Sequence, residues 1–177
     1  MARLIALLRA VNVGGRKLPM AELRTLCGGL GWEDVETYVQ SGNVVFTAPG
    51  GTGKLETALE EAVERRFGFH SDAMVRTAAQ WRALLEANPF LDVAEREPGR
   101  VMVGIPKRAL AAGSAATIAA EAAAGERVEE AGGALWFHYP QGAGTSKLTP
   151  RLIDRSAGSP VTARNWRTVS ALLEMLE

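Results

Sequence analysis

An order of short hydrophobic segments that occurs twice constrains this chain more than any other feature. In the first half, an apolar run at 4–8 precedes leucines at helical spacing within 19–30, and two β-rich runs then flank a turn at 41–43. An amphipathic stretch at 55–67, with its glutamates on a solvated face, and a short apolar run at 73–76 complete the series. The pattern predicts strand, helix, strand, strand, helix, strand.

The second half repeats this order from residue 100. Its predicted segments are a strand at 100–105, a helix at 115–124, a hairpin of 127–130 with 135–139, a helix at 148–156 and a strand at 161–163. Each half then ends in an amphipathic helix that contains a Trp-Arg pair, Trp81-Arg82 or Trp166-Arg167. The sequence therefore predicts an α+β protein, a tandem duplication of two ferredoxin-like (βαββαβ) subdomains, each followed by an extra helix.

The same series predicts the domain boundaries. The N-terminal lobe with its helix spans 1–87, and the C-terminal lobe with its helix spans 100–177. Residues 88–99, which contain Pro89 and Pro98, are expected to link them. Because 47% of the 177 residues are hydrophobic, the chain can form a core in each lobe.

Charge and cysteine content restrict partners and location. The 20 basic residues balance the 20 acidic ones, so no overall field attracts nucleic acid or an anionic membrane. Within 1–30, however, five basic side chains accompany the single acidic Glu22. Cys27 is the only cysteine, which precludes an internal disulfide, and the apolar run at 4–8 is too short for a signal peptide or a membrane span. We expect a cytoplasmic protein without a membrane partner.

Topology predicts which loops lie together. In a ferredoxin-like sheet the first and second strands run the same way, so the loop after the first strand and the hairpin after the second share one end of the sheet. Residues 12–17 should therefore lie near 40–43. In the second lobe, 142–147 should lie near 164–165.

The loop at 8–17 combines glycines and cations between a strand and a helix. Backbone amides of Gly14 and Gly15, with the side chains of Arg9 and Lys17, are suited to hold an anion. The alternative is a tight turn with solvated charges. The candidate ligand-binding residues at the loop ends of both lobes are Arg9, Asn12, Gly14, Gly15, Lys17, Gln40, Ser41, Asn43, Ser146, Lys147, Arg164 and Asn165.

Three further motifs have competing interpretations. Residues 48–55 approach the phosphate-loop pattern, but Leu55 stands where a metal-binding Ser or Thr is required, which favours a simple turn. Ser146, or its neighbour Thr145, caps the following helix or contacts a ligand. Trp136 and His138 share one face of a strand, where they could stack bases, although packing is the favoured interpretation.

Catalytic constellations are scarce in this sequence. The two histidines, His70 and His138, lack the spacing of common metal motifs, so we expect no metal site and no cofactor. The sequence assigns no catalytic residue and leaves open whether the chain is an enzyme. The leading hypothesis is binding of a small phosphorylated or carboxylated ligand; the alternatives are weak single-stranded nucleic-acid binding and a protein-interaction module. The oligomeric state is left open.

Several long stretches are similar to one bacterial family. The matching residues are 8–15 with 19–20, 37–46, 88–90 (Asn-Pro-Phe), 139–140 with 142–149, and 162–169. On these stretches the chain resembles the family catalogued as domain of unknown function 1697. The resemblance implies two ferredoxin-like subdomains and no particular activity. One departure is Ala10, where glycine is expected.

Overall fold

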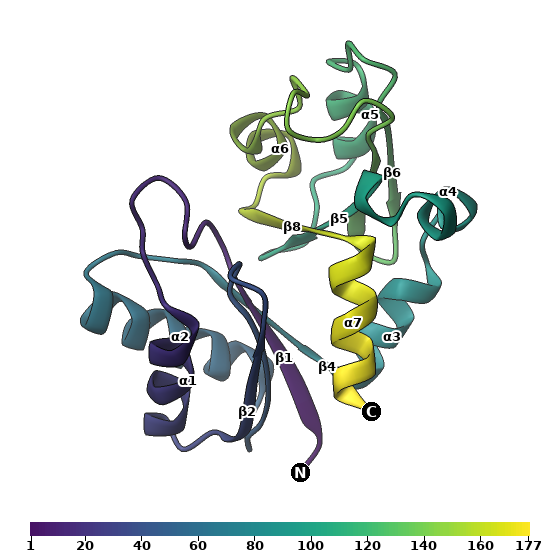
Figure 1. Ribbon diagram of the computed structural model, residues 1–177. Helices are drawn as coiled ribbons and strands as arrows, with labels where there is room; N and C mark the ends of the chain where they lie inside the picture. Colours follow the sequence, from purple (N-terminus) through teal and green to yellow (C-terminus); the bar gives the residue numbers. More distant parts are fainter. The chain divides into compact units, whose positions relative to one another are not determined.

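The computed structural model describes residues 1–177, which form two compact units (Figure 1). Unit 1 comprises Met1–Trp81 with Leu172–Glu177, and unit 2 comprises Arg82–Ala171. Each unit contains one four-stranded antiparallel sheet with helices. The predicted α+β fold with two ferredoxin-like lobes is confirmed.

Unit 1 follows the predicted order of elements. Its elements are β1 (Arg3–Leu8), α1 (Met20–Gly29), β2 (Glu33–Tyr38), β3 (Asn43–Thr47), α2 (Thr52–Phe67) and β4 (Ala73–Thr77). The strands lie in the order β2-β3-β1-β4. Because β1 and β2 are both antiparallel to β3, they run in the same direction. The ends of β1 and β2 therefore meet at one end of the sheet, together with the starts of β3 and β4.

The core of unit 1 lies between one face of this sheet and the two helices. Leu4, Ala6 and Leu8 alternate along β1 toward this core, and α1 contributes Leu23 and Cys27. Burial raises the pKa of the Cys27 thiol to about 12. This cysteine is therefore a core residue and not a nucleophile.

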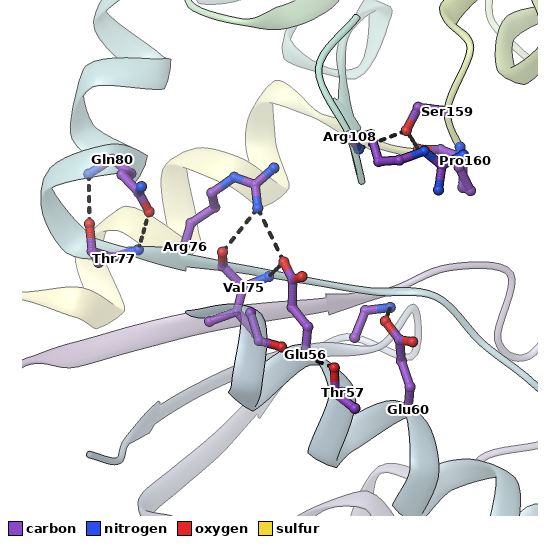
Figure 2. A network of polar contacts seen from close by, with 12 residues as sticks. Glu56, Thr57, Glu60, Val75, Arg76, Thr77, Gln80, Arg108, Ser159 and Pro160 are labelled. Atoms are coloured by element: carbon purple, nitrogen blue, oxygen red, sulfur yellow. Dashed lines mark hydrogen bonds and ion pairs between the residues drawn. The ribbon is translucent and has the colours of Figure 1, made fainter. Parts of the chain in front are cut away.

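Two glutamates of α2 bind the free edge of β4 (Figure 2). A carboxylate oxygen of Glu60 accepts a hydrogen bond from the Ala73 amide at 3.2 Å, and one of Glu56 accepts from the Val75 amide at 3.0 Å. Glu56 also pairs with Arg76 at 3.6 Å. The assignment of both glutamates to a solvated helix face was wrong, because an edge strand carries outward amides that need acceptors.

The opposite edge of the sheet, β2, is irregular. Its register with β3 shifts between Glu33 and Glu36, and Asp34 between them has a φ of +49°. Such a bulge bends an edge strand and interrupts its row of free hydrogen-bonding groups.

In each unit, the fourth strand is followed directly by a capped helix. Thr77 ends β4 and starts α3 (Ala78–Glu86) with a reciprocal cap, in which the Gln80 amide donates to Thr77 Oγ1 and the Thr77 amide donates to Gln80 Oε1 (Figure 2). In unit 2, Asn165 ends β8 (Val161–Asn165), and its Oδ1 accepts from the Thr168 amide in the first turn of α7 (Trp166–Leu176). The tandem repeat thus extends to the appended helices.

Unit 2 repeats the topology with shorter helices. Its remaining elements are α4 (Leu91–Arg96), the 3-10 turn η1 (Pro98–Arg100), β5 (Val101–Pro106), α5 (Ser114–Ala119), β6 (Arg127–Ala131), β7 (Ala134–His138) and α6 (Pro150–Ala157). The strand order is β6-β7-β5-β8. Ile118 of α5 and Ile153 of α6 pack with Phe137 of β7.

Three segments of unit 2 differ in detail from the sequence prediction. Helix α5 has only six residues and ends at Ala119, before residue 124. Helix α6 is capped by Thr149, whose Oγ1 accepts from the Leu152 amide at 3.2 Å, and not by Thr145 or Ser146. Residues 88–99 include α4 and the start of η1. No helix anywhere in the chain is both long enough and apolar enough to cross a membrane.

Candidate functional site

The candidate site is the end of the unit 1 sheet where β1 and β2 finish. The Leu8 amide donates to the Gly42 carbonyl at 2.9 Å, and Asn12 Nδ2 donates to the Gln40 carbonyl at 2.5 Å. Residues 12–17 therefore lie beside 40–43, the juxtaposition that the topology predicts.

The side chain of Asn12 connects the loop after β1 to the hairpin by hydrogen bonds. Besides its bond to Gln40, its Nδ2 donates to the Leu18 carbonyl at 3.0 Å, and its Oδ1 accepts from the Leu18 amide at 2.9 Å. Both amide hydrogens of the side chain are thus in use. Asn12 shapes the loop and has no donor left for a ligand.

The hairpin residues also have structural partners. Asn43 is fully buried, and its Nδ2 donates to the Tyr38 carbonyl and to Ser41 Oγ, each at 2.9 Å. Gly42 has a φ of +83°, and a Cβ there would lie 2.8 Å from Val11 Cγ2. Only glycine fits this approach of the hairpin to the first loop.

The turn at 13–17 is the part of this end that has unused donors. Gly14 and Gly15 have φ values of +56° and +83°, and their amides take part in no hydrogen bond of the chain. Arg16 and Lys17 are exposed beside them. The buried Leu18 and the exposed Pro19 separate this turn from the first residue of α1, Met20, so the helix begins within one residue of the predicted start at 19.

Three cationic side chains lie in or beside this turn, and they differ in how strongly the chain holds them. Arg16 donates to the His70 carbonyl at 3.3 Å, and its guanidinium carbon lies 5.9 Å from the centre of the Phe69 ring. Arg9 is half-buried, and its backbone is held by the Asp72 carbonyl and by the Ser71 hydroxyl. Lys17 forms no ion pair.

Backbone strain gathers at the same end of the sheet. Ala10, Asn12 and Val39 have φ values of +57°, +58° and +51°. Left-handed backbone is unfavourable for alanine and more so for a β-branched residue, and such residues concentrate at functional sites. The value at Ala10 explains why glycine is the residue expected there.

Three potential metal ligands lie next to this end. One ligand atom each of Glu60, His70 and Asp72 falls within 4.8 Å of the others. The atoms already interact within the chain, since His70 Nε2 lies 3.1 Å from Asp72 Oδ1 and Glu60 accepts from the Ala73 amide. An imidazole with two carboxylates is a set of ligands that suits a divalent transition metal. The spacing of these residues in the sequence did not indicate this set.

The second candidate set, in unit 2, does not form a hydrogen-bonded group. Ser146 Oγ donates to Glu126 Oε2 at 2.6 Å and accepts from the Leu148 amide at 3.1 Å. The Ser146 hydroxyl, followed by backbone amides, lowers the pKa of the Glu126 carboxyl. Lys147 is exposed, while Asn165 caps α7.

Arg164 has a mainly structural environment. It is buried, and its guanidinium donates to Thr162 Oγ1 at 2.7 Å and to the Ala163 carbonyl at 3.0 Å. Burial lowers the pKa of Arg164 to about 10. Because these donors are directed to the chain, Arg164 is poorly placed to receive a ligand from solvent.

Trp136 of the aromatic strand β7 offers no open ring for base stacking. Trp136 is fully buried, and its Nε1 donates to the Ala131 carbonyl at 3.1 Å. His138 is half-buried and lies 6.2 Å from the Phe90 ring, centre to centre. A base needs an exposed ring face, which Trp136 does not present.

Sequence reasoning missed a polar pocket of about 340 Å³ in unit 2, lined in part by Asn88, Phe90, Arg96 and Arg127. The Asn-Pro-Phe stretch is its only signal in the sequence, and this stretch lies within the predicted linker. Arg127 is distant in sequence, so spacing alone could not find this pocket.

Two β-α-β-β-α-β units in one chain, with the loop geometry above, define a tandem ferredoxin-like α+β protein. The chain belongs to the family described as "Protein of unknown function (DUF1697)", whose model matches residues 1–136. The fold is similar to that of the conserved bacterial protein SP0830 from Streptococcus pneumoniae, with a TM-score of 0.72 and 24% identity over 99% of this chain and 98% of that chain. No curated protein matches the chain.

Proposed function

We propose that the protein binds a small anionic ligand at the turn of residues 13–17. The observation that supports this most is the pair of consecutive amides of Gly14 and Gly15, which lie in left-handed backbone and take part in no hydrogen bond of the chain. Successive amides in such turns form concave sites for phosphate or carboxylate oxygens. Neither glycine has an atom within 4 Å of its Cβ position, so the approach to the backbone is open.

The charges around the turn favour an anion. Arg16 and Lys17 are exposed next to the two amides, and Arg9 follows β1 at the same end of the sheet. The nearby acidic groups are Asp72, which is already engaged with His70, and Glu60, which accepts a hydrogen bond from the Ala73 amide. The local excess of positive charge would raise the concentration of anions at this end of an otherwise neutral molecule.

Strain at the sheet end supports a role in recognition. Left-handed conformations cost a non-glycine residue about 1–3 kcal/mol each, and three of them surround this turn. The hydrogen bonds of Asn12 hold the loop in this shape before any ligand arrives. A loop organised in advance loses less entropy on binding.

The test is an anion titration of the full chain. Binding is monitored through the amide signals of Gly14 and Gly15 in NMR spectra. Inorganic phosphate comes first, and sugar phosphates and nucleotides then define the ligand class. We expect these two signals to shift, and an Arg9→Ala, Lys17→Ala double variant to bind about tenfold or more weakly.

The matched control is a Lys54→Ala, Arg65→Ala double variant, which removes the same charge from exposed positions of α2. It should bind as the wild type does. Unmoved glycine signals, or equal loss of binding in both double variants, would show that the turn is not the site.

A further inference from the structure

Unit 2 contains a small pocket, and one of the residues that line it has a buried, unpaired donor. The pocket has a volume of about 340 Å³, within the range of sites for small ligands. Asn88, one of the lining residues, is only 9% exposed, and its Nδ2 has no hydrogen-bond partner. Buried polar groups are nearly always paired, so an unpaired donor in a residue that lines a pocket indicates a missing acceptor.

The identity of the orphaned atom follows from its neighbour. The Phe90 amide donates to the other side-chain atom of Asn88 at 2.7 Å, and only the carbonyl oxygen Oδ1 can accept this bond. The free group is therefore the amide nitrogen with its two hydrogens. It calls for a ligand with acceptor oxygens.

Arg127 contributes the second element of the pocket and is held in place from two sides. Its guanidinium carbon lies 4.7 Å from the centre of the Phe90 ring, and its NH2 lies 3.3 Å from His138 Nδ1. A guanidinium can only donate, so Nδ1 accepts and His138 is neutral. Fixing the guanidinium plane on an aromatic ring reduces the entropy that binding would remove.

The charges of the pocket favour an oxyanion. Arg96 of α4 and Arg127 both line it, and the one acidic lining residue, Asp92, pairs with neither. Two guanidiniums match the paired oxygens of a carboxylate or phosphate, and the Asn88 amide supplies a further donor.

We propose that this pocket, formed by Asn88, Phe90, Arg96 and Arg127, binds the carboxylate or phosphate group of a small molecule. The proposal does not depend on anion binding in unit 1. It gives the Asn-Pro-Phe stretch a function: Asn88 orients a donor, Pro89 fixes the turn, and Phe90 supports the arginine.

The proposal is tested by titrating the full chain with inorganic phosphate and, in a separate experiment, with acetate. The ionic strength is held constant in both titrations. The readout is the pair of side-chain NH2 signals of Asn88 in NMR spectra, which is separate from the Gly14 and Gly15 amides. We expect one anion to shift the Asn88 signals at a lower concentration than the other, which distinguishes a phosphate from a carboxylate ligand. If neither anion moves them, the proposal is wrong.

Two variants and one control separate binding from folding. Asn88→Asp keeps the acceptor for the Phe90 amide but replaces the donor with a negative charge, and it should abolish binding. Because this variant has no side-chain NH2 group, its binding is followed through the backbone amide signal of Phe90. Arg96→Gln changes an exposed side chain and should weaken binding about tenfold or more, whereas Arg151→Gln on α6 should not. Unchanged affinity in Arg96→Gln, measured on a folded protein, would overturn the proposal even if Asn88→Asp fails to fold.

Discussion

Replacing Gly42 with alanine tests the closure of the first loop against the hairpin. The new Cβ would lie 2.8 Å from Val11 Cγ2 and 2.9 Å from Leu8 Cβ, closer than carbon atoms approach in folded proteins. Leu8 is anchored in β1, and Val11 is buried and stiff about its χ1 angle, so neither side chain can easily move aside.

The expected loss of stability has two parts. Alanine at a φ of +83° costs about 1–2 kcal/mol, and the steric overlap adds about 1–3 kcal/mol. The sum of about 2–5 kcal/mol is a large share of the roughly 5–15 kcal/mol that stabilises a typical domain. Reduced freedom of the unfolded chain offsets about 0.4–1 kcal/mol of this.

Gly31→Ala is the matched control. Gly31 has the same φ of +83°, but nothing lies within 4 Å of its Cβ position. The backbone and unfolded-state contributions therefore cancel between the two variants, which leaves the steric part. Urea unfolding followed by circular dichroism should show Gly42→Ala to be less stable than Gly31→Ala by about 1–3 kcal/mol. Equal free energies of unfolding would refute the close approach of hairpin and loop.

Two further predictions concern a cap and a histidine. Thr77→Ala removes the cap of α3 and should lower the free energy of unfolding by about 1 kcal/mol, whereas Thr57→Ala on the exposed face of α2 should have little effect; thermal denaturation compares them. Burial, and after it the Arg127 guanidinium, lower the pKa of His138 below its ordinary 6.5, so its neutral form stabilises the fold above that pH and the stabilisation is lost as the pH falls through the folded-state pKa. Wild type should thus lose stability relative to His138→Gln between about pH 7 and about pH 5, and a constant difference between the two would contradict this assignment.

Local patterns sufficed to predict the order of elements. The continuous apolar run of β1, and the helical spacing of apolar residues around Leu23 in α1 and around Leu59 in α2, identify core residues, and turn residues separate the segments. The sequence also predicted that the loops after β1 and β2 meet, since that follows from strand direction alone. The ends of the elements were harder to predict from local patterns. Strand β2 ends at Tyr38 because Val39, a strong strand former, has left-handed backbone in the structure.

The roles of polar side chains could not be predicted, because they depend on contacts between distant segments. Glu56 and Glu60 have the spacing of a solvated face, yet they bind the backbone of β4. Asn12 was expected to bind a ligand, and its hydrogen bonds to Gln40 and Leu18 give it a structural role. In unit 2, Arg127 reaches the Asn88 pocket across more than thirty residues of chain, about the length of one supersecondary unit.

Both edges of the unit 1 sheet are protected against pairing with a strand of a second copy of the chain. Unpaired strand edges are where a second molecule can add a strand and start a polymer. On β4 the amides of Ala73 and Val75 already have glutamate acceptors, and on β2 the bulge around Asp34 breaks the row. Unit 1 can therefore keep a sheet with two edges without offering a neighbouring copy a continuous template for fibre growth.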